Sequence, residues 1–171
     1  TSSREISLAH KRLSIVDLSN EAAQPMGLPD GSIWVVFNGE IYNHAEIRTE
    51  LEQKGHRFRT SHSDTEVILH AYQEWGIQCI ERFRGMFAIG LWDQPKDLFY
   101  LVRDRIGIKP LYYTYQNGCC YFASEIKAIL QDKSIPRKLN FQSAYDYLTF
   151  LTVPAPNTFF EGIHKLPAGH Y

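Results

Sequence analysis

The stretch Asn38-Gly39-Glu40 places an amide, a bare backbone and a carboxylate side by side, directly after an apolar run from Ile33 to Phe37. The Asn38 side-chain amide and the Gly39 backbone N–H are neutral donors that can converge on one oxygen. Two such donors make an oxyanion hole, in which losing one donor typically costs about 3–4 kcal/mol of transition-state stabilisation. Glycine also lets a ligand approach the backbone closely. The alternative interpretation is a simple turn that ends the strand, because Asn-Gly is a strong turn signal.

Charged residues elsewhere in the chain could complete a site for an amino acid. Arg12 stands in an otherwise increasingly apolar strand, and its guanidinium can grip a carboxylate with two hydrogen bonds. Glu40 and Asp64 could hold an ammonium group if they lie beside Arg12. Arg12 and Asp64 each have an ordinary alternative role: Arg12 can extend to solvent at a sheet edge, and Asp64 can cap a helix.

The sequence offers no obvious nucleophile for such a site. Cys79, Cys119 and Cys120 are interpreted as structural, since buried cysteine behaves as a small hydrophobe. The last two are adjacent on an expected strand, so one side chain should face inward and the other outward. His44 and His62 lie near the candidate residues in sequence, but nothing in their spacing assigns them a catalytic role.

The composition narrows the class of protein. The 171 residues suffice for one domain with a sizeable core. The 18 basic and 19 acidic residues nearly cancel, which argues against a nucleic-acid partner. No apolar run approaches the roughly 18 residues of a membrane helix, which argues against a membrane protein. Three cysteines are too few for a disulfide framework, and no histidines stand at metal-ligand spacing, so we expect a cytoplasmic protein without a metal site.

The first half of the chain reads as strands followed by helices. The expected elements are strands at 6–16 and 33–37 and helices at 45–54, 64–75 and 77–83. Asn43 is expected to cap the first helix and Gly55 to end it, while Gly76 ends the second. The first strand is separated from the second by a turn-rich stretch that contains Pro25 and Gly31.

The second half reads as hairpins followed by helices. The expected elements are strands at 86–92, 98–102, 111–115 and 119–123 and helices at 125–130 and 141–151. Asn117-Gly118 predicts a two-residue hairpin turn. Ser124 is expected to cap the first of the two helices. Strands and helices that alternate in blocks indicate an α+β fold with largely antiparallel pairing.

Two segments are assigned to neither a helix nor a strand. The charged stretch 103–109 is either a solvated loop or a more ordered corner between strands. Beyond residue 151, Pro154, Pro156 and Pro167 argue against regular structure. We therefore expect a domain over residues 1–151 and a linker over residues 152–171.

Several of these stretches, taken in order, resemble one family: the class II glutamine amidotransferase domain of glutamine-hydrolysing asparagine synthetases. The similar stretches are Lys11–Leu18, Gln24–Met26, Phe37–Asn43, Ser63–Val67, Arg84–Ala88, Leu91–Asp93, Arg103–Tyr113 and Ala123–Ala128. The final segments, Val153–Phe159 and Lys165–Tyr171, look like the part of that family that leads into the synthetase domain. The resemblance covers nearly the whole chain.

The resemblance implies a fold, a substrate and residue roles. The fold is the four-layer αββα sandwich of N-terminal nucleophile hydrolases. L-Glutamine is the substrate: Arg12 holds its α-carboxylate, Glu40 and Asp64 hold its α-ammonium, and Asn38 and Gly39 stabilise the oxyanion. In the family an N-terminal cysteine attacks the glutamine amide, which is covalent catalysis. The released ammonia reaches a synthetase domain of the same polypeptide, where aspartate is activated with ATP and magnesium; the amidotransferase domain itself needs no cofactor.

The sequence departs from the family at its start. It begins at Thr1, without the family's N-terminal cysteine and the residues that join it to the Arg12 strand. Thr1 stands at the wrong place in the motif order to replace that cysteine. We therefore expect an N-terminally truncated fold that does not hydrolyse glutamine by itself. An unpaired sheet edge also makes a homodimer possible.

Two other functions remain open from the sequence. One is a non-catalytic scaffold that has lost its nucleophile, as in β-lactam synthetase-like proteins. The other is an amidotransferase domain that serves a different ammonia acceptor. The full set of Arg12, Asn38, Gly39, Glu40 and Asp64 favours a glutamine-binding domain over a decayed scaffold.

Overall fold

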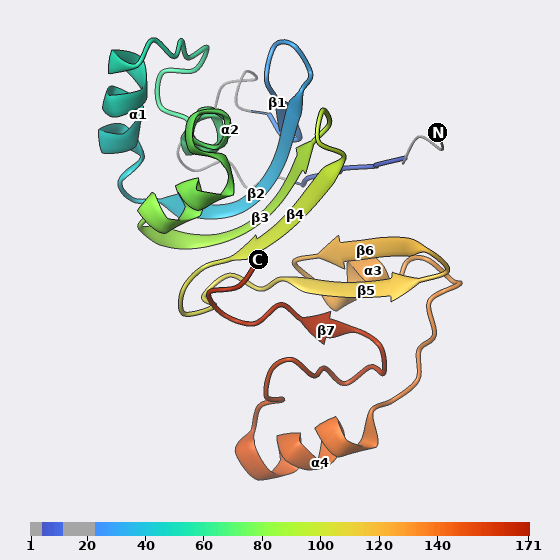
Figure 1. The fold of residues 1–171 in the computed structure, drawn as a ribbon. Helices are drawn as coiled ribbons and strands as arrows, with labels where there is room; N and C mark the ends of the chain where they lie inside the picture. Colours follow the sequence, from blue (N-terminus) through green and yellow to red (C-terminus); the bar gives the residue numbers. More distant parts are fainter. Residues whose placement is uncertain (1–4, 12–22) are drawn as a thin grey trace. The chain divides into compact units, whose positions relative to one another are not determined.

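The computed structural model describes residues 5–11 and 23–171 (Figure 1). It comprises two units, Thr1–Leu101 and Val102–Tyr171, and each is described by itself. Residues 6–11 do not belong to a strand, so the expected strand at 6–16 is wrong over this part. Its remainder, the Arg12 side chain and Thr1 lie outside the described residues.

A four-stranded sheet forms the centre of the first unit. Its strands are β1 (Met26–Gly27), β2 (Ile33–Ile41), β3 (Gly85–Asp93) and β4 (Leu98–Arg103), in the order β1-β2-β3-β4. The last two residues of β4 fall in the second unit. Strands β2 and β3 pair antiparallel over their whole length, from Ile33 opposite Asp93 to Ile41 opposite Gly85. A turn over residues 94–97 joins β3 to β4.

Strand β2 is longer than the sequence predicts. It continues through Asn38-Gly39-Glu40 to Ile41, so the interpretation of Asn38-Gly39 as a turn is wrong. The glycine serves a close backbone approach instead: a Cβ added to Gly39 would lie 2.0 Å from the Met86 carbonyl oxygen. Gly85, in turn, allows the Glu40 carbonyl to approach, since a Cβ there would lie 2.1 Å from that oxygen.

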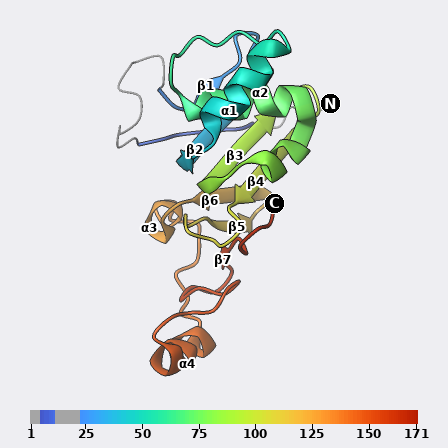
Figure 2. The same cartoon turned by 90° about the vertical axis from the view of Figure 1, so that its left-hand side faces the viewer.

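Helices cover one face of this sheet. Helix α1 (His44–Gln53), helix α2 (Asp64–Trp75) and the 3-10 helix η2 (Gly76–Arg82) follow β2 in the chain. Both views place α1 and α2 on the same side of the strands (Figures 1 and 2). The Tyr72 hydroxyl of α2 donates to Asp93 Oδ2 at 2.7 Å, which shows that odd-numbered β3 residues point toward the helices. The buried residues Val35, Phe37 and Ile41 of β2 lie on that same face, because directly paired residues share a face.

The ends of these helices follow the predictions in part. Gly55 (φ +96°) and Gly76 (φ +61°) have the positive φ values that favour glycine just after a helix. Asn43 occupies the N-cap position of α1, but its side chain does not cap the helix. It instead donates to Arg82 O at 3.0 Å and accepts from Arg84 N at 2.8 Å, which fixes the start of α1 against the segment that leads into β3.

The second unit contains a smaller antiparallel sheet. Its elements are β5 (Tyr112–Gln116), β6 (Cys119–Ala123), α3 (Ile126–Ile129), α4 (Phe141–Phe150) and β7 (His164–Lys165), with the strand order β6-β5-β7. The Asn117-Gly118 turn has φ values of +52° and +80°, as a two-residue hairpin requires. Ile129, Ile135 and Ile163 form the core cluster that joins α3 to the segment before β7.

Three expectations for this unit are wrong. Strand β7 lies in the segment expected to be irregular, because His164-Lys165 falls between the prolines and pairs with β5. Glu125, not Ser124, occupies the N-cap position of α3. Cys119 and Cys120 are both exposed, although successive residues point to opposite faces, so only Cys79 of the three cysteines is buried.

The charged stretch 103–109 is an ordered corner and not a solvated loop. Asp104 is fully buried, and its carboxylate accepts from the backbone N–H groups of Ile108 and Lys109, each at 2.9 Å. The Arg103 guanidinium donates to the carbonyls of Gly107 at 2.8 Å and Leu166 at 2.7 Å. These charges therefore satisfy backbone groups inside the fold.

The two antiparallel sheets with flanking helices confirm the α+β class. None of the helices over the described residues is of a length and apolarity that would let it span a bilayer. The division of the chain into residues 1–151 and 152–171 stays a prediction.

Candidate functional site

The edge of β2 that faces β1 presents a row of backbone N–H groups. The Phe37 N–H donates to Gln24 Oε1 at 2.6 Å, and the Ile41 N–H donates to Asp64 Oδ2 at 3.2 Å. The Tyr42 N–H points the other way and donates to Arg84 O, just before β3, at 2.7 Å. Because N–H directions alternate along a strand, the Gly39 N–H faces the same edge as those of Phe37 and Ile41. The candidate oxyanion donor therefore faces away from β3, between two N–H groups that side chains hold.

The side chains of Asn38 and Glu40 lie on the other face of the sheet from the helices. Both are even-numbered residues of β2, whereas the helix-covered face carries odd-numbered ones. Both are half-buried. An amide and a carboxylate thus flank the Gly39 N–H on one face, and this arrangement suits a ligand that carries both a developing negative oxygen and an ammonium group.

Asp64 reaches the same edge from helix α2. It is the first residue of the helix and is only 7% exposed. The interpretation of Asp64 as the N-cap is wrong, since Ser63 occupies that position and accepts from Glu66 N at 3.4 Å. Burial raises the pKa of Asp64, against the Ile41 N–H bond and the nearby His44, which lower it. A ligand ammonium beside this carboxylate would offset the cost of burying its charge.

The structure thus brings four of the five sequence-predicted site residues to one stretch of β2. Asn38, Gly39 and Glu40 are consecutive, and Asp64 bonds the next residue, Ile41. The fifth, Arg12, lies outside the described residues. Their roles in binding and catalysis stay predictions.

Two residues at this edge were not predicted from their chemistry. Gln24 accepts from the Phe37 N–H through Oε1, and its Nε2 donates to Thr65 Oγ1 at 3.3 Å. Glutamine and threonine are common polar residues, so only their place in the family-like motifs could have drawn attention to them. Thr65 follows Asp64 directly, so the first turn of α2 supports both groups that hold the edge.

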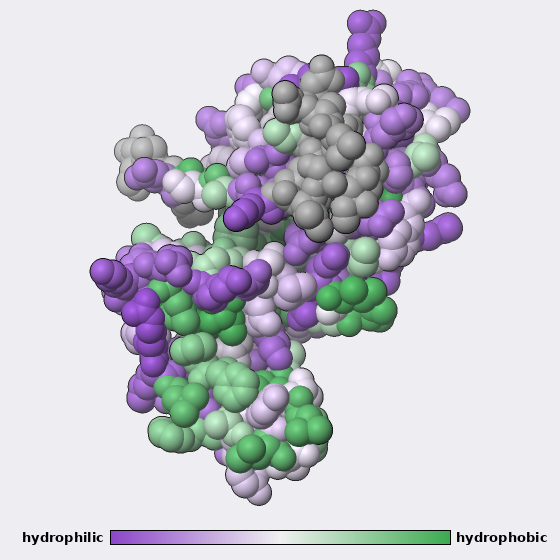
Figure 3. Space-filling model, turned by 180° about the vertical axis from the view of Figure 1, so that it is seen from behind, coloured by the Kyte–Doolittle hydropathy of each residue, from purple (hydrophilic) through white to green (hydrophobic). Residues whose placement is uncertain are grey.

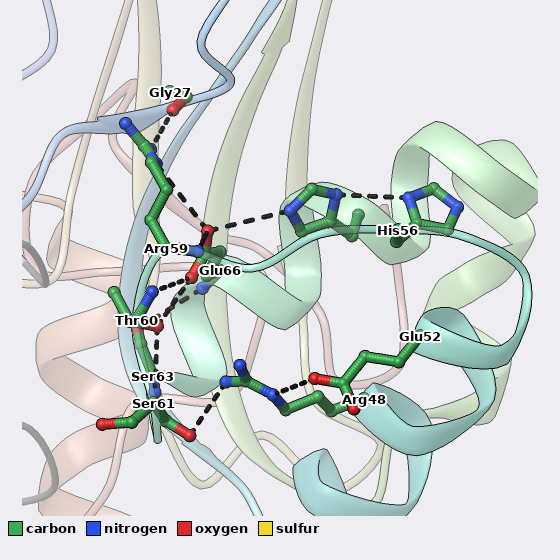
Figure 4. A network of polar contacts seen from close by, with 10 residues as sticks. Gly27, Arg48, Glu52, His56, Arg59, Thr60, Ser61, Ser63 and Glu66 are labelled. Carbon is green, nitrogen blue, oxygen red and sulfur yellow. Dashed lines mark hydrogen bonds and ion pairs between the residues drawn. The ribbon is translucent and has the colours of Figure 1, made fainter.

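Glu66, also in the first turn of α2, anchors the loop that precedes the helix (Figure 4). It is 1% exposed and accepts from the backbone N–H groups of Arg59 and Thr60, each at 2.8 Å, and from the Thr60 hydroxyl at 2.6 Å. His70 Nε2 lies 3.7 Å from Glu66 Oε1. Burial raises the pKa of Glu66, but His70 and the Arg59 and Thr60 donors outweigh it and lower that pKa to about 2.

A chain of polar contacts continues from Glu66 to the surface. The Nδ1 atoms of His70 and His56 lie 3.2 Å apart, and His56 Nε2 lies 3.1 Å from Glu74 Oε2. These contacts tie the end of α1 to α2 and thereby fix the helix that carries Asp64. Among the described residues, no three or more His, Cys, Asp or Glu side chains are grouped to hold a metal ion.

Comparison with known proteins identifies the family. The family model described as a glutamine amidotransferase domain matches residues 1–171. The chain belongs to this family. It is 44% identical over 172 residues to asparagine synthetase [glutamine-hydrolyzing] 2 of Bacillus subtilis, an alignment that covers 98% of this chain and 22% of the relative. It is 39% identical over 170 residues to the Amidase chyE of Penicillium rubens, covering 97% of this chain and 24% of that protein.

A solved structure supports the fold of this amidotransferase domain. Glutamine phosphoribosylpyrophosphate amidotransferase from B. subtilis, in complex with ADP and GMP, superposes with a TM-score of 0.56 at 25% identity. The match covers 66% of this chain and 27% of that one. The α+β fold is thus of the amidotransferase type, as the resemblance in sequence predicts. The chain spans about a quarter of the length of the curated relatives that it matches.

Proposed function

We propose that this amidotransferase domain is the glutaminase part of a glutamine-hydrolysing asparagine synthetase. It would bind L-glutamine, cleave the side-chain amide to glutamate, and supply ammonia for the ATP-dependent amidation of aspartate. The observation that carries the proposal is the β2 edge, where the Gly39 N–H points outward between the bonds that Gln24 and Asp64 make to Phe37 and Ile41.

The residue roles follow from the charges of glutamine. Asn38 and the Gly39 N–H would stabilise the oxyanion that forms when the amide carbonyl is attacked. Glu40 and Asp64 would bind the α-ammonium, and Arg12 the α-carboxylate. Neutral donors suit the amide carbonyl because they do not compete with the charged groups that hold the other end of the substrate.

We assign the nucleophile to no residue of this chain. A cysteine attacks as its thiolate, but burial raises the pKa of Cys79 to about 12, so this thiol is inert at neutral pH. Cys119 and Cys120 lie on β6, which belongs to a different sheet from β2. The mature N-terminus of the natural protein is the place to seek the nucleophile, and N-terminal sequencing of that protein identifies it.

The remaining partners of the reaction belong to the longer protein. The B. subtilis relative extends far beyond the matched region, which supports a synthetase domain on the same polypeptide as the ammonia consumer. ATP and magnesium would act there, and the amidotransferase domain would need no cofactor. A cytoplasmic location and a homodimer stay predictions, the latter open to light scattering.

Glutamate release by the natural full-length protein tests the proposal. Asn38→Ala should lower kcat by about 100- to 1000-fold, because one oxyanion donor is lost while the α-amino and α-carboxylate contacts persist. Asn157→Ala, at an exposed residue of the second unit, is the matched control and should leave turnover unchanged. Equal activity of wild type and Asn38→Ala would contradict the assignment.

A second candidate is an amidotransferase domain that serves a different ammonia acceptor. The similarity to a protein named as an amidase favours keeping it, because that relative matches the chain over nearly the same length as the synthetase. Aspartate-dependent ATP consumption in the presence of glutamine supports the synthetase. Glutamate release without any effect of aspartate supports the other acceptor.

A further inference from the structure

Strand β1 protects only the first part of the β2 edge. It is two residues long and pairs Met26 with Val35 and Gly27 with Trp34. Beyond Val35, the next N–H groups that face this edge belong to Phe37, Gly39 and Ile41. Backbone pairing with β1 therefore ends at Val35, and the Phe37 N–H lies between this last pair and the candidate oxyanion donor, Gly39.

The side chain of Gln24 takes over where the strand stops. Its Oε1 accepts the Phe37 N–H at 2.6 Å, as a carbonyl of a longer β1 would. Its Nε2 donates to Thr65 Oγ1 at 3.3 Å, and Asp64, the neighbour of Thr65, accepts the Ile41 N–H. One helical turn thus supports the acceptors on both sides of Gly39.

Resting on the proposed function, we propose that Gln24 and Thr65 position the Gly39 N–H for the oxyanion of the glutamine amide. A strand edge without an acceptor at Phe37 is free to twist, and a displaced donor stabilises the developing charge less. Gln24 touches neither substrate nor nucleophile in this assignment, so it is a positioning residue. The amide is suited to the role because it is neutral and can accept from Phe37 while it donates to Thr65.

Two substitutions at Gln24 test this positioning role in different ways. Gln24→Met keeps the volume but removes the acceptor, so the Phe37 N–H loses its partner. Gln24→Glu keeps an acceptor, and the Thr65 hydroxyl can turn to donate to it, but the carboxylate adds a negative charge two residues from the oxyanion donor. Both should lower kcat of the full-length enzyme by roughly 10- to 100-fold with little change in KM, since misplacement affects the transition state most.

Thr65 provides a graded test of the same device. Thr65→Val keeps the shape and removes the hydroxyl that anchors Gln24 Nε2, so kcat should fall by less than in Gln24→Met. Thr65→Ser restores a hydroxyl and should recover most of the wild-type kcat. Gln131→Met is the matched control, because Gln131 is exposed in the second unit and its side chain donates to the nearby Lys127 O, at 3.1 Å.

Hydrogen exchange of the full-length protein separates this proposal from the proposed function. The Phe37 amide should exchange faster in Gln24→Met than in wild type, while amides of α4 keep their rates. Faster exchange at Phe37 together with the kcat losses and the Thr65→Ser recovery supports the positioning role.

Three outcomes overturn it. Unchanged Phe37 exchange in Gln24→Met shows that Gln24 does not hold the edge. Faster exchange with unchanged kcat shows that the edge does not govern turnover. If wild type releases no glutamate from glutamine, the proposed function fails and the catalytic role of Gln24 with it; the exchange result then still decides whether Gln24 holds β2.

Discussion

Helices α2 and α4 show opposite uses of the same sequence pattern. Both have apolar residues at helical spacing, and both end where the pattern ends. Along α2 the apolar residues are buried, with Leu69 at 0% exposure. Along α4 they are exposed, with Leu148 at 79%, and Figure 3 shows apolar side chains gathered at this end of the second unit. Periodicity therefore predicts a helix but does not reveal which surface covers it.

The polar residues of the two helices differ in the same way. Those of the α2 first turn reach other segments: Asp64 bonds Ile41, Thr65 accepts from Gln24, and Glu66 holds Arg59 and Thr60. In α4, by contrast, Gln142 donates to Asp146 and Thr149 to Tyr145 O, both within the helix. A helix whose polar residues hold other segments can position a site, and α2 is such a helix.

Truncation of a leucine in each helix should give the largest contrast. Leu69→Ala leaves a cavity in the core of the first unit and should lower the free energy of unfolding by about 2–5 kcal/mol. Leu148→Ala removes an exposed side chain and should change it by less than about 0.5 kcal/mol. Urea denaturation of the two variants measures both. Equal losses would show that the apolar residues of α4 are packed in solution, and the contrast between the helices would disappear.

Neutralising an acid in each helix should give the next largest effect. Glu66→Gln replaces a carboxylate oxygen by an NH2 group, which cannot accept from Thr60 or Arg59, and should cost about 1–3 kcal/mol. Asp146→Asn, at a half-buried residue whose carboxylate accepts from Gln142 of the same helix, should cost less than about 0.5 kcal/mol. Denaturation curves give both values, and amide exchange over residues 59–63 should rise only in Glu66→Gln. A stable Glu66→Gln variant with an unchanged loop would show that the loop has another anchor.

The sequence allowed most elements to be predicted because their signals are local. The Asn117-Gly118 hairpin and the glycine stops at Gly55 and Gly76 depend on the conformations of single residues, and all three are confirmed. The predicted end of β2 was wrong because Asn38-Gly39 forms a turn only when no strand pairs with it, and β3 pairs with it here. Partners far apart in sequence decide such cases.

Candidate site residues could be predicted from the sequence only where their side chains or backbone offer hydrogen-bond donors or charges suited to a ligand. Asn38, Gly39, Glu40 and Asp64 carry donors and charges, and the structure brings them to one stretch of β2. Gln24 has no such signature, and its bond to Phe37 depends on where β1 ends. Strand β7 escaped prediction for a related reason, since two residues between prolines form a strand only because β5 accepts them.

The pH dependence of stability should differ between wild type and Glu66→Gln. The folded-state pKa of Glu66 is about 2, below the value of 4.5 for the free group, so the unfolded chain takes up this proton first as the pH falls. The stabilisation is therefore fully present above pH 4.5 and is lost as the pH falls through about 2. Unfolding free energies of both variants between pH 6 and pH 2.5 should converge toward low pH. A constant difference across that range would contradict the lowered pKa, because the other carboxylates are common to both variants.

Removing the helix caps should give the smallest changes in the free energy of unfolding. Here the loss should be larger in α4 than in α2, the reverse of the two preceding comparisons. Asn140 Oδ1 accepts from Ser143 N at 3.0 Å and Ser63 Oγ from Glu66 N at 3.4 Å, so each caps the first turn of its helix. Ser63→Ala should cost only about 0.5 kcal/mol, near the low end for a cap, because Asp64 and Glu66 also hold the start of α2. Asn140→Ala should cost about 1 kcal/mol, since α4 has few buried side chains to keep its first turn closed. Amide exchange at residues 141–145 should then rise about fivefold, which corresponds to that loss, while residues 64–68 in Ser63→Ala change less. The reverse ranking would mean that packing, and not the cap, holds α4 in place.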